Sequence, residues 1–483
     1  MAEGTATAIA LLPTDTLLPT DTPTPEPSLT PTETLPPTVT PTATPTFPPT
    51  PAVAVAMDNY QTVTIADEVQ GNIGNLWLSF VNVNDRASAT AIAGSVTPGT
   101  PPPSSNLASV YVVSPNFPNN RIKVLDLPAS TDANVYWSPN GAYIAYYLES
   151  GSKSGLYLLS LEVGYEIRLF TVENLSPRGI FSPPVWSPDS RQITLALNTG
   201  TDLDIYSVGP DANNFRNLTQ NPAYDFWPSW SPDGQFMAFV SDRAFCKTWV
   251  PNEPDTCYTP EATPPDGGNL YLYSVATGET RLLSDEWLTA APTWITNSRI
   301  SFIAGERGEL LANSALKWID VNSGITTPIS PTDNGISAFD PSWSPDGSKV
   351  VYQEAGTETA VVVRDAAGLE LARLTDFTFP RFGFSGAWSP DGLRLVLAGR
   401  GGQCPYGLIV LNAAFESIYR AQPRPGACDP VCSPDGRYIA FSGIMPGEDG
   451  VFNVYMSSPS GGGTRNITGA LGGQILPPCR VVR

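Results

Sequence analysis

Short runs of hydrophobic residues, separated by turns rich in Pro, Asp and Gly, follow one another along most of the chain. In a run such as YIAF at residues 438–441, successive side chains should point to opposite faces of a strand, because the side-chain period of a β-strand is two. The abundance of turn residues, 50 Pro and 41 Gly in 483 residues, favours many short strands over helices. We therefore predict an all-β protein.

A unit of Trp, a Ser-Pro-Asp-Gly turn and an apolar strand recurs from about residue 130 onward. A repeat of roughly 40 to 50 residues with four short strands is typical of propeller blades. In a complete copy the Pro presets φ, the Asp accepts hydrogen bonds from nearby backbone and the Gly permits a positive φ, whereas the copy at Trp294 (WITNS) is degenerate. The Trp supplies a large apolar surface between neighbouring blades. The copies begin at Trp137, Trp186, Trp230, Trp294, Trp343, Trp388 and Cys432. Successive starting residues are 49, 44, 64, 49, 45 and 44 residues apart.

These copies, which include WSPDG at Trp230, Trp343 and Trp388, resemble the repeats of TolB-type β-propellers. Similar repeats occur in the propellers of prolyl-oligopeptidase-like peptidases. The resemblance covers about residues 130–483 and implies a β-propeller fold, but it implies little about function because the motif builds the scaffold. The peptidases carry their catalytic triad on a separate α/β domain, and this chain has no counterpart of that domain. The resemblance therefore assigns no catalytic residue here.

We predict a single propeller of eight blades, seven of them continuous in sequence and one assembled from both ends of the chain. Residues 476–482 (LPPCRVV) look like the beginning of an inner strand. Residues 75–82, 109–114 and 121–127 supply its candidate second, third and fourth strands. Such closure removes the open edges that make sheets adhere to one another. The alternative is seven blades with the N-terminal strands forming an extra layer.

Residues 1–57 differ in composition from the propeller, which we place at residues 58–483. The first 50 residues contain 16 Thr and 12 Pro, which predicts an extended, largely polyproline-II arm of the kind that carries O-glycans. The sequence LLPTDT at residues 11–16 is repeated at residues 17–22, and a solvated spacer has no need of Leu pairs. We predict that the arm engages a neighbouring copy through Ile9, Leu11, Leu12, Leu17 and Leu18. The alternative is a passive stalk.

Charge and the absence of one residue type exclude several functions. The chain has 26 basic and 46 acidic residues, a formal charge of −20, which disfavours binding to nucleic acid and to anionic lipid. It contains no histidine, which rules out Ser-His-Asp and Cys-His nucleophile activation and His-ligated zinc. No paired carboxylates or phosphate-binding loop stand out, and no apolar run reaches transmembrane length. We predict a non-enzymatic protein with no catalytic, metal-binding or cofactor-binding residues and no transmembrane segment.

Six cysteines in a chain with extracellular features favour disulfides over a metal site. Sequence alone leaves 15 pairings open for six cysteines. Proximity in the predicted blade layout favours Cys246–Cys257, Cys404–Cys428 and Cys432–Cys479, with Cys428–Cys432 as a rival pair that would strain a short strand entry.

Residues 244–268 form an insertion between the second and third strands of the third blade, which accounts for the 64-residue spacing. Cys246 and Cys257 lie inside this insertion and are well placed to staple it. Long ordered insertions on propellers are often binding loops. Trp249, Glu253 and Tyr258 are therefore candidate contacts for a protein partner or a glycan, and a stapled passive loop is the alternative.

Two functions from different classes fit these features. The first is an extracellular or cell-surface structural protein of a prokaryote, whose arm engages copies of itself to build a filament or surface layer. The second is a secreted or surface-anchored binding module for a protein, peptide or glycan, with the tail as a stalk. A periplasmic location is the alternative placement for either.

Overall fold

The computed structural model divides the chain into two units, Met1–Pro48 and Pro49–Arg483, and describes residues of the second unit only. The predicted boundary after residue 57 lies outside the described residues. The described ranges are 61–83, 107–114, 117–128, 135–148, 154–171, 182–198, 200–259, 261–263, 265–308, 313–332, 335–356, 358–380, 382–401, 404–421, 426–444, 452–469, 471 and 474–481.

Strands dominate these ranges, and the one helix in them is α1 (Asp67–Gln70). The strands fall into consecutive antiparallel groups, which we number in chain order. Group 1 also carries β1 (Gln61–Thr62) on the outer side of its last strand. Its other strands are β5 (Val135–Trp137), β6 (Tyr143–Leu148), β7 (Gly155–Ser160) and β8 (Tyr165–Thr171). Group 2 consists of β9 (Val185–Trp186), β10 (Ile193–Asn198), β11 (Leu203–Val208) and β12 (Arg216–Asn217).

Groups 3 and 4 form one hydrogen-bonded sheet, because β16 pairs with β18. Group 3 consists of β13 (Asp225–Trp230), β14 (Phe236–Ser241), β15 (Gly268–Ser274) and β16 (Thr280–Leu288). Group 4 consists of β17 (Thr293–Thr296), β18 (Arg299–Gly305), β19 (Ala315–Asp320) and β20 (Thr326–Pro328). Group 5 is a separate sheet of β21 (Ser337–Trp343), β22 (Lys349–Ala355), β23 (Thr359–Asp365) and β24 (Glu370–Leu374).

Groups 6 and 7 are likewise joined, through a parallel pairing of β26 with β29. Group 6 consists of β25 (Phe384–Trp388), β26 (Leu395–Gly399), β27 (Ile409–Leu411) and β28 (Ser417–Arg420). Group 7 consists of β29 (Gly426–Cys432), β30 (Ile439–Ile444), β31 (Asn453–Ser457) and β32 (Arg465–Asn466).

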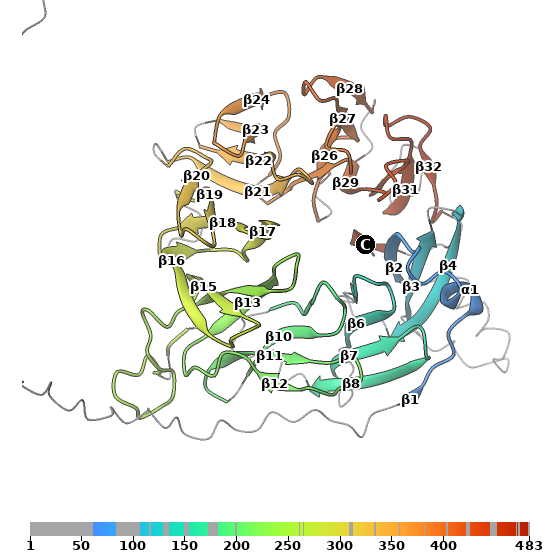
Figure 1. The fold of residues 1–483 in the computed structure, drawn as a ribbon. Helices are drawn as coiled ribbons and strands as arrows, with labels where there is room; N and C mark the ends of the chain where they lie inside the picture. Colours follow the sequence, from blue (N-terminus) through green and yellow to red (C-terminus); the bar gives the residue numbers. More distant parts are fainter. Residues whose placement is uncertain are drawn as a thin grey trace, which may run out of the picture. The chain divides into compact units, whose positions relative to one another are not determined.

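The last group combines both ends of the propeller sequence. Its strand order is β33-β2-β3-β4, so the C-terminal strand pairs with an N-terminal one. This is the order that the sequence predicts for the composite blade. Figure 1 shows the meeting of the two ends, with β2 in blue beside the red C-terminal segment. The bounds are β33 (Gln474–Val481), β2 (Leu78–Val83), β3 (Leu107–Ser114) and β4 (Phe117–Pro128).

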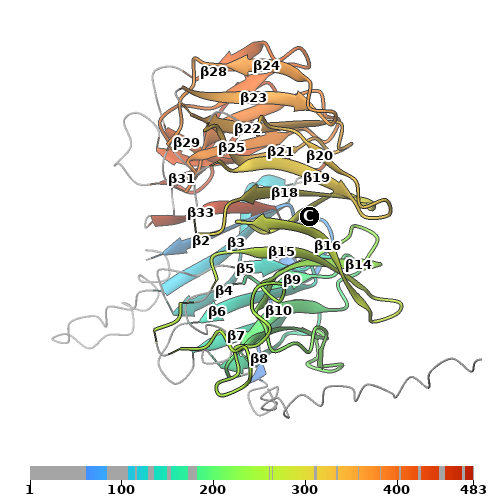
Figure 2. The same ribbon diagram turned by 90° about the vertical axis from the view of Figure 1, so that its left-hand side faces the viewer.

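A buried hydrophobic cluster joins each group to the next. Figure 1 shows the groups following one another around a common centre, and Figure 2 shows the same groups from the side. Val351 and Trp388 belong to one such cluster, between groups 5 and 6. The composite group takes part in two clusters, one shared with group 7 and one with group 1. Burial of apolar surface between groups therefore continues around the whole set.

Both faces of the middle strands are covered, which differs from the simple alternation expected from the sequence. In β15, for example, Gly268 to Tyr273 are all buried. Neighbouring groups pack against the two faces of each sheet, so inward and outward side chains are equally shielded from water. This explains why these strands read as apolar runs rather than as strict alternation.

The repeat motif makes the contacts that its residues predict. In group 3 the Ser231 hydroxyl donates to Asp233 at 2.7 Å, the Phe236 amide donates to Ser231 Oγ at 2.9 Å, and Gly234 has a φ of 70°. In four of the repeats the indole N–H of the repeat Trp also joins consecutive groups. Trp294 donates to the Ser229 oxygen at 2.9 Å.

Candidate functional site

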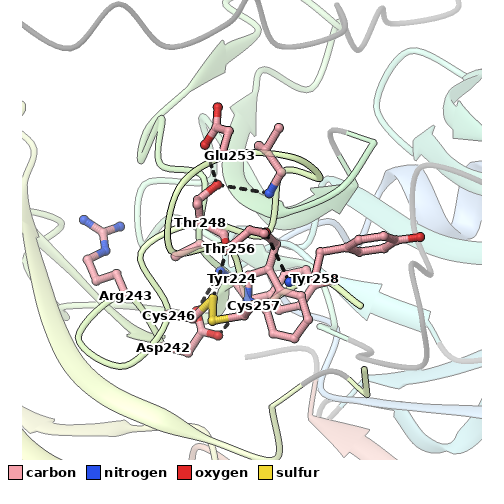
Figure 3. The surroundings of a disulfide bond; sticks show 12 residues. Tyr224, Asp242, Arg243, Cys246, Thr248, Glu253, Thr256, Cys257 and Tyr258 are labelled. Carbon is pink, nitrogen blue, oxygen red and sulfur yellow. Dashed lines mark hydrogen bonds between the residues drawn. A yellow bond between two sulfur atoms is a disulfide. The ribbon is translucent and has the colours of Figure 1, made fainter. Parts of the chain in front are cut away.

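The predicted insertion lies where the sequence places it, between β14 and β15 (Figure 3). A disulfide joins Cys246 and Cys257, whose Cα atoms are 5.8 Å apart. Inside the loop, the Cys257 amide donates to the Thr248 oxygen at 2.9 Å, which closes the segment on itself. The insertion is therefore an ordered, stapled loop, and we refer to residues 242–258 as the stapled loop.

Trp249 requires a correction, because it is not presented to a partner. Its side chain is only 5% exposed and packs on the Tyr224 ring, with 4.7 Å between centroids. Its indole Nε1 donates to Asp242 Oδ2 at 2.9 Å. A large amphipathic side chain satisfied at both its apolar and polar ends is an anchor. Trp249 thus attaches the stapled loop to group 3.

Glu253 and Tyr258 lie nearer the surface of the same loop. The Thr248 hydroxyl donates to Glu253 Oε2 at 2.8 Å, and the Tyr258 amide donates to the Thr256 hydroxyl at 3.1 Å. In Figure 3 the Tyr258 ring points away from the disulfide. Both side chains are partly buried, so a binding role for them remains a proposal.

Four aspartates in and near the stapled loop are buried, namely Asp202, Asp204, Asp225 and Asp242. Burial raises the pKa of Asp202 to about 7, with the Asp204 charge adding to the shift, and burial likewise raises the pKa values of Asp204 and Asp242 to about 6. Burial also raises the pKa of Asp225, although Arg243 opposes the shift through an ion pair of 2.5 Å. Within the described residues no cluster of His, Cys, Asp or Glu has the arrangement of a metal site. These carboxyls are better understood as buried hydrogen-bond acceptors.

The other predicted site residues fall in different places. A second disulfide joins Cys404 and Cys428, with 5.3 Å between Cα atoms. Cys432 forms no disulfide with another cysteine whose side chain the structure describes, and the side chain of Cys479 lies outside that set. The Cys432–Cys479 pairing therefore stays a prediction, although β29 and β33 do contact each other. The arm residues Ile9, Leu11, Leu12, Leu17 and Leu18 also lie outside the described residues.

A pocket of about 570 Å³, not predicted from the sequence, opens where the first strands of groups 4, 5 and 6 come together. We call it the inner pocket. Its walls come from β17, β18, β21 and β25, from the segments next to them, and from Arg400 directly after β26. The lining residues are Thr289, Ala290, Ala291, Thr293, Ser301, Phe302, Ile303, Ser314, Ala338, Phe339, Asp340, Pro341, Ser342, Phe382, Phe384, Ser385, Gly386 and Arg400.

Asp340 reaches the inner pocket through a distortion of β21. The pairing of β21 with β22 shifts register between Phe339 and Ser342, which marks a β-bulge. Asp340 lies in this bulge with a φ of 50°, a conformation that is costly for a residue with a side chain. Bulges re-aim side chains and are common beside functional sites. The bulge therefore places a carboxylate in the pocket wall.

The Asp340 carboxylate pairs with the guanidinium of Arg400, which follows β26 in group 6. The Asp340 side chain is 7% exposed and that of Arg400 is 55% exposed. Burial raises the pKa of Asp340, whereas the charge and hydrogen bond of Arg400 lower it. Asp429 lies near the same guanidinium but does not line the pocket, and burial raises its pKa to about 6. Arg400 therefore carries the positive charge of this region of the ring.

Two buried oxygens of the pocket lining lack hydrogen-bond partners among the described residues. They are Asp340 Oδ2 and Ser301 Oγ. An unpaired buried polar atom is costly, and such atoms in a pocket wall mark places where a ligand or water completes the bonding. The pocket thus combines an ion pair with unused hydrogen-bonding capacity.

Comparisons with known proteins agree with this architecture. Residues 130–245 match the model of the TolB beta propeller domain. The Tol-Pal system protein TolB of Francisella tularensis subsp. mediasiatica is 28% identical over 253 residues, 46% of this chain and 56% of that protein. The TolB homolog of Chlorobium luteolum is 32% identical over 106 residues, which is 22% of this chain and 23% of that protein.

The repeat, the strand groups and these matches agree. The chain contains a β-propeller of the TolB type. It spans 56% of the length of its Francisella relative, so the activity and partners of the whole relative do not transfer directly. Among solved structures, the crystal structure of a eukaryotic initiation factor matches with a TM-score of 0.50 and 13% identity, covering 79% of this chain and 88% of the other. At that identity, the likeness concerns the fold alone.

One sequence pattern of this TolB-type propeller could have indicated the bulge that places Asp340 in the inner pocket. Phe-Asp-Pro precedes the Ser-Trp of the fifth repeat, where Asp340 now lies, and Trp227 and Asp429 precede Pro at the corresponding places in β13 and β29. All three have a positive φ of 50° to 54°. A Trp or Asp before Pro, three residues ahead of the repeat Trp or of Cys432, therefore accompanies a bulge in each of these three strands. The part of the propeller that the structure describes contains no helix with the length and hydrophobicity needed to cross a membrane.

Proposed function

We propose that this TolB-type propeller is a binding protein and that its ligand occupies the inner pocket. The observation that carries the proposal is the strained bulge that places Asp340 in a pocket wall beside Arg400. Small-molecule sites are concave, with a few convergent polar groups in a mostly apolar lining, and have volumes of roughly 300 to 1,000 Å³. The inner pocket falls within this volume range and brings several polar groups together, with a lining that is about equally polar and apolar.

We propose binding without catalysis. Asp340 is the one carboxylate among the lining residues, and its partner is a permanently charged guanidinium rather than a base. The hydroxyls of the lining have no histidine or second carboxylate in the lining to activate them. General acid–base chemistry needs such a partner within hydrogen-bonding distance.

A thermal-shift screen tests the proposed site. The library should contain neutral, cationic and anionic small molecules, and the variant Ala291→Trp should fill the pocket from its exposed rim. We expect at least one compound to stabilise the wild-type protein and not the variant. Compounds that stabilise both proteins equally, or none that stabilise either, would refute the proposal.

We propose that the protein functions outside the cytoplasm, at the surface of a prokaryotic cell, with the periplasm as the alternative. Two disulfides support this location, because such bonds persist in oxidising compartments. The Francisella relative is named as a Tol-Pal system protein, which makes a component of such a system a further candidate. Cell fractionation with an antibody to the propeller distinguishes these locations.

We propose eight blades, with the composite group as the closing blade. The proposal is supported by the strand order β33-β2-β3-β4 and by the hydrophobic clusters that join this group to groups 7 and 1. Seven blades plus an extra layer would leave β33 without a place beside β2. An experimental electron density map counts the blades directly.

Self-assembly through the arm remains a second candidate function, favoured by the repeated LLPTDT at residues 11–22. We propose that residues 5–22 dock on a neighbouring copy. Deletion of residues 1–24, followed by light scattering and electron microscopy, tests this. If the full-length protein assembles and the deletion variant assembles equally well, the arm is a stalk.

A further inference from the structure

We propose that the ligand of the inner pocket is a neutral saccharide. This inference rests on the proposed binding function and specifies the chemistry that the pocket selects. It follows from the charges, the hydrogen-bonding groups and the aromatic surface of the lining, taken in turn below.

The charges of the lining favour a ligand without net charge. Asp340 and Arg400 are the charged lining residues, and they are bonded to each other. A cation that approaches the carboxylate meets the guanidinium, and an anion that approaches the guanidinium meets the carboxylate. The formal charge of −20 on the whole chain further disfavours anions.

The hydrogen-bonding groups of the lining favour a ligand with several hydroxyls. Asp340 Oδ2 accepts only, and Arg400 donates only. Neighbouring hydroxyls on a sugar ring can donate to the first while accepting from the second, which satisfies both partners of the ion pair at once. Charge-assisted hydrogen bonds of this kind are stronger than neutral ones. Ser301 Oγ provides a further unpartnered group. Other hydroxyls in the lining belong to Thr289, Thr293, Ser314, Ser342 and Ser385.

The aromatic surface of the pocket suits the apolar face of a sugar ring. Phe382 is 50% exposed although it is a large hydrophobic residue, and it has a φ of 57°. Its ring meets Phe339 edge to face, with 5.0 Å between centroids and 75° between planes. Exposure and backbone strain at the same aromatic residue indicate a surface held in place for contact. Sugar rings carry C–H groups that pack on such a ring while their hydroxyls bond to the ion pair.

The proposal is tested by isothermal titration calorimetry with sugars matched in shape and different in charge. The probes are N-acetylglucosamine and its disaccharide, galactose and lactose as neutral sugars, glucosamine as a cation and glucuronic acid as an anion. A capped, uncharged peptide of Gly, Ser and Ala serves as a neutral non-sugar. We expect at least one neutral sugar to bind with a millimolar or lower Kd, and its charged analogues to bind at least tenfold more weakly.

Three variants and one control assign the binding to the pocket. Asp340→Asn and Phe382→Ala should each weaken sugar binding at least fivefold. Ser301→Ala should weaken binding while the unfolding temperature stays the same or rises, because it removes a buried hydroxyl that has no partner in the described fold. Phe245→Ala should leave binding unchanged, since Phe245 has a similar exposure, 49%, but lies in the stapled loop and does not line the pocket.

Failure of the saccharide proposal is separable from failure of the proposed function. If no neutral sugar binds below 10 mM, or if the pocket variants bind sugar as the wild type does, the saccharide inference is wrong. If the peptide or a charged probe binds instead and Ala291→Trp abolishes that binding, the pocket remains a binding site for another class of ligand. If no probe or library compound responds to Ala291→Trp, both proposals fail.

Discussion

The indole Nε1 of Trp388 donates a hydrogen bond to the backbone oxygen of Ser342 at 3.0 Å and thereby joins group 6 to group 5. Ser342 also lines the inner pocket. The Trp that recurs in the sequence to build the ring therefore also fixes one wall of the pocket. Scaffold and site share this contact, so the stability of the ring and the geometry of the pocket are linked.

Replacing Trp388 with Phe should destabilise the propeller more than the same change at Trp343. Trp343 occupies the equivalent position one group earlier, and its Nε1 has no hydrogen-bond partner among the described residues. Both changes remove the same atoms, but only the change at Trp388 also removes a hydrogen bond, worth about 1 kcal/mol, and the change at Trp343 relieves a buried N–H without a partner. The free energy of unfolding from urea titration measures it. Equal losses in the two variants would contradict a stabilising role for the Trp388–Ser342 contact.

The buried aspartates near the stapled loop should make the propeller more stable at mildly acidic than at alkaline pH. Burial raises the pKa of Asp202 to about 7, above the unfolded value near 3.8, so the folded state binds the proton more tightly. Stability from this carboxyl is therefore present at low pH and lost as the pH rises through about 7. Asp204, Asp225 and Glu253 act on Asp202 in the same direction.

Asp202→Asn tests this linkage, because it removes the charge while retaining the shape. We expect the variant to gain on the order of 1 kcal/mol relative to wild type at pH 8 and little at pH 5. Urea unfolding at the two pH values gives both numbers. The raised pKa of Asp202 would be contradicted if the free energy of unfolding of the wild type rose from pH 5 to pH 8 and that of the variant changed with pH in the same way.

Removal of the Cys246–Cys257 disulfide should loosen the stapled loop locally. In the chain-entropy model, closing a loop of this size contributes about 3 kcal/mol at most. The anchoring of Trp249 by Asp242 and Tyr224 should keep the loop attached, so we expect protease cleavage within residues 247–256 without global unfolding. Limited proteolysis with mass spectrometry of the double Ser variant checks this.

The matched control is the double Ser variant of Cys404 and Cys428, the other disulfide of the described structure. Its stapled loop should resist cleavage as in wild type. Equal cleavage of the loop in both variants would indicate that the disulfide effect is global rather than local.

Thiol labelling decides the state of Cys432. Burial raises the pKa of the Cys432 thiol to about 12, so a free thiol there would be unreactive in the folded protein. We predict a bond to Cys479, and therefore no labelling even in guanidinium without reductant. Labelling of Cys432 and Cys479 alone would contradict the predicted third disulfide. Labelling of all six cysteines would also contradict the proposed location in an oxidising compartment.

Much of the fold follows from the sequence because the repeat carries its own turn chemistry. The Ser, Asp and Gly of a complete turn act within a few residues of one another, as at Ser231, Asp233 and Gly234, so the local sequence determines the local structure. The composite group was also predictable, since its strands resemble those of complete repeats.

The candidate site could not be predicted in the same way. The inner pocket depends on residues far apart in sequence, such as Ser301 and Arg400, and on a bulge whose effect on Asp340 emerges only when neighbouring groups pack. Trp249 looked like a surface contact because an insertion was assumed to face solvent. Its burial arises from Asp242 and Tyr224, which the sequence does not bring together.

Hydrogen–deuterium exchange with and without the compound that stabilises the protein most tests the central claim most directly. If the inner pocket is the binding site, added ligand should slow exchange at residues 289–303, 338–342 and 382–386, which carry most of its lining. The stapled loop, residues 242–258, should exchange at the same rate with and without ligand. Protection confined to the stapled loop, or protection that persists in Ala291→Trp, would contradict the claim.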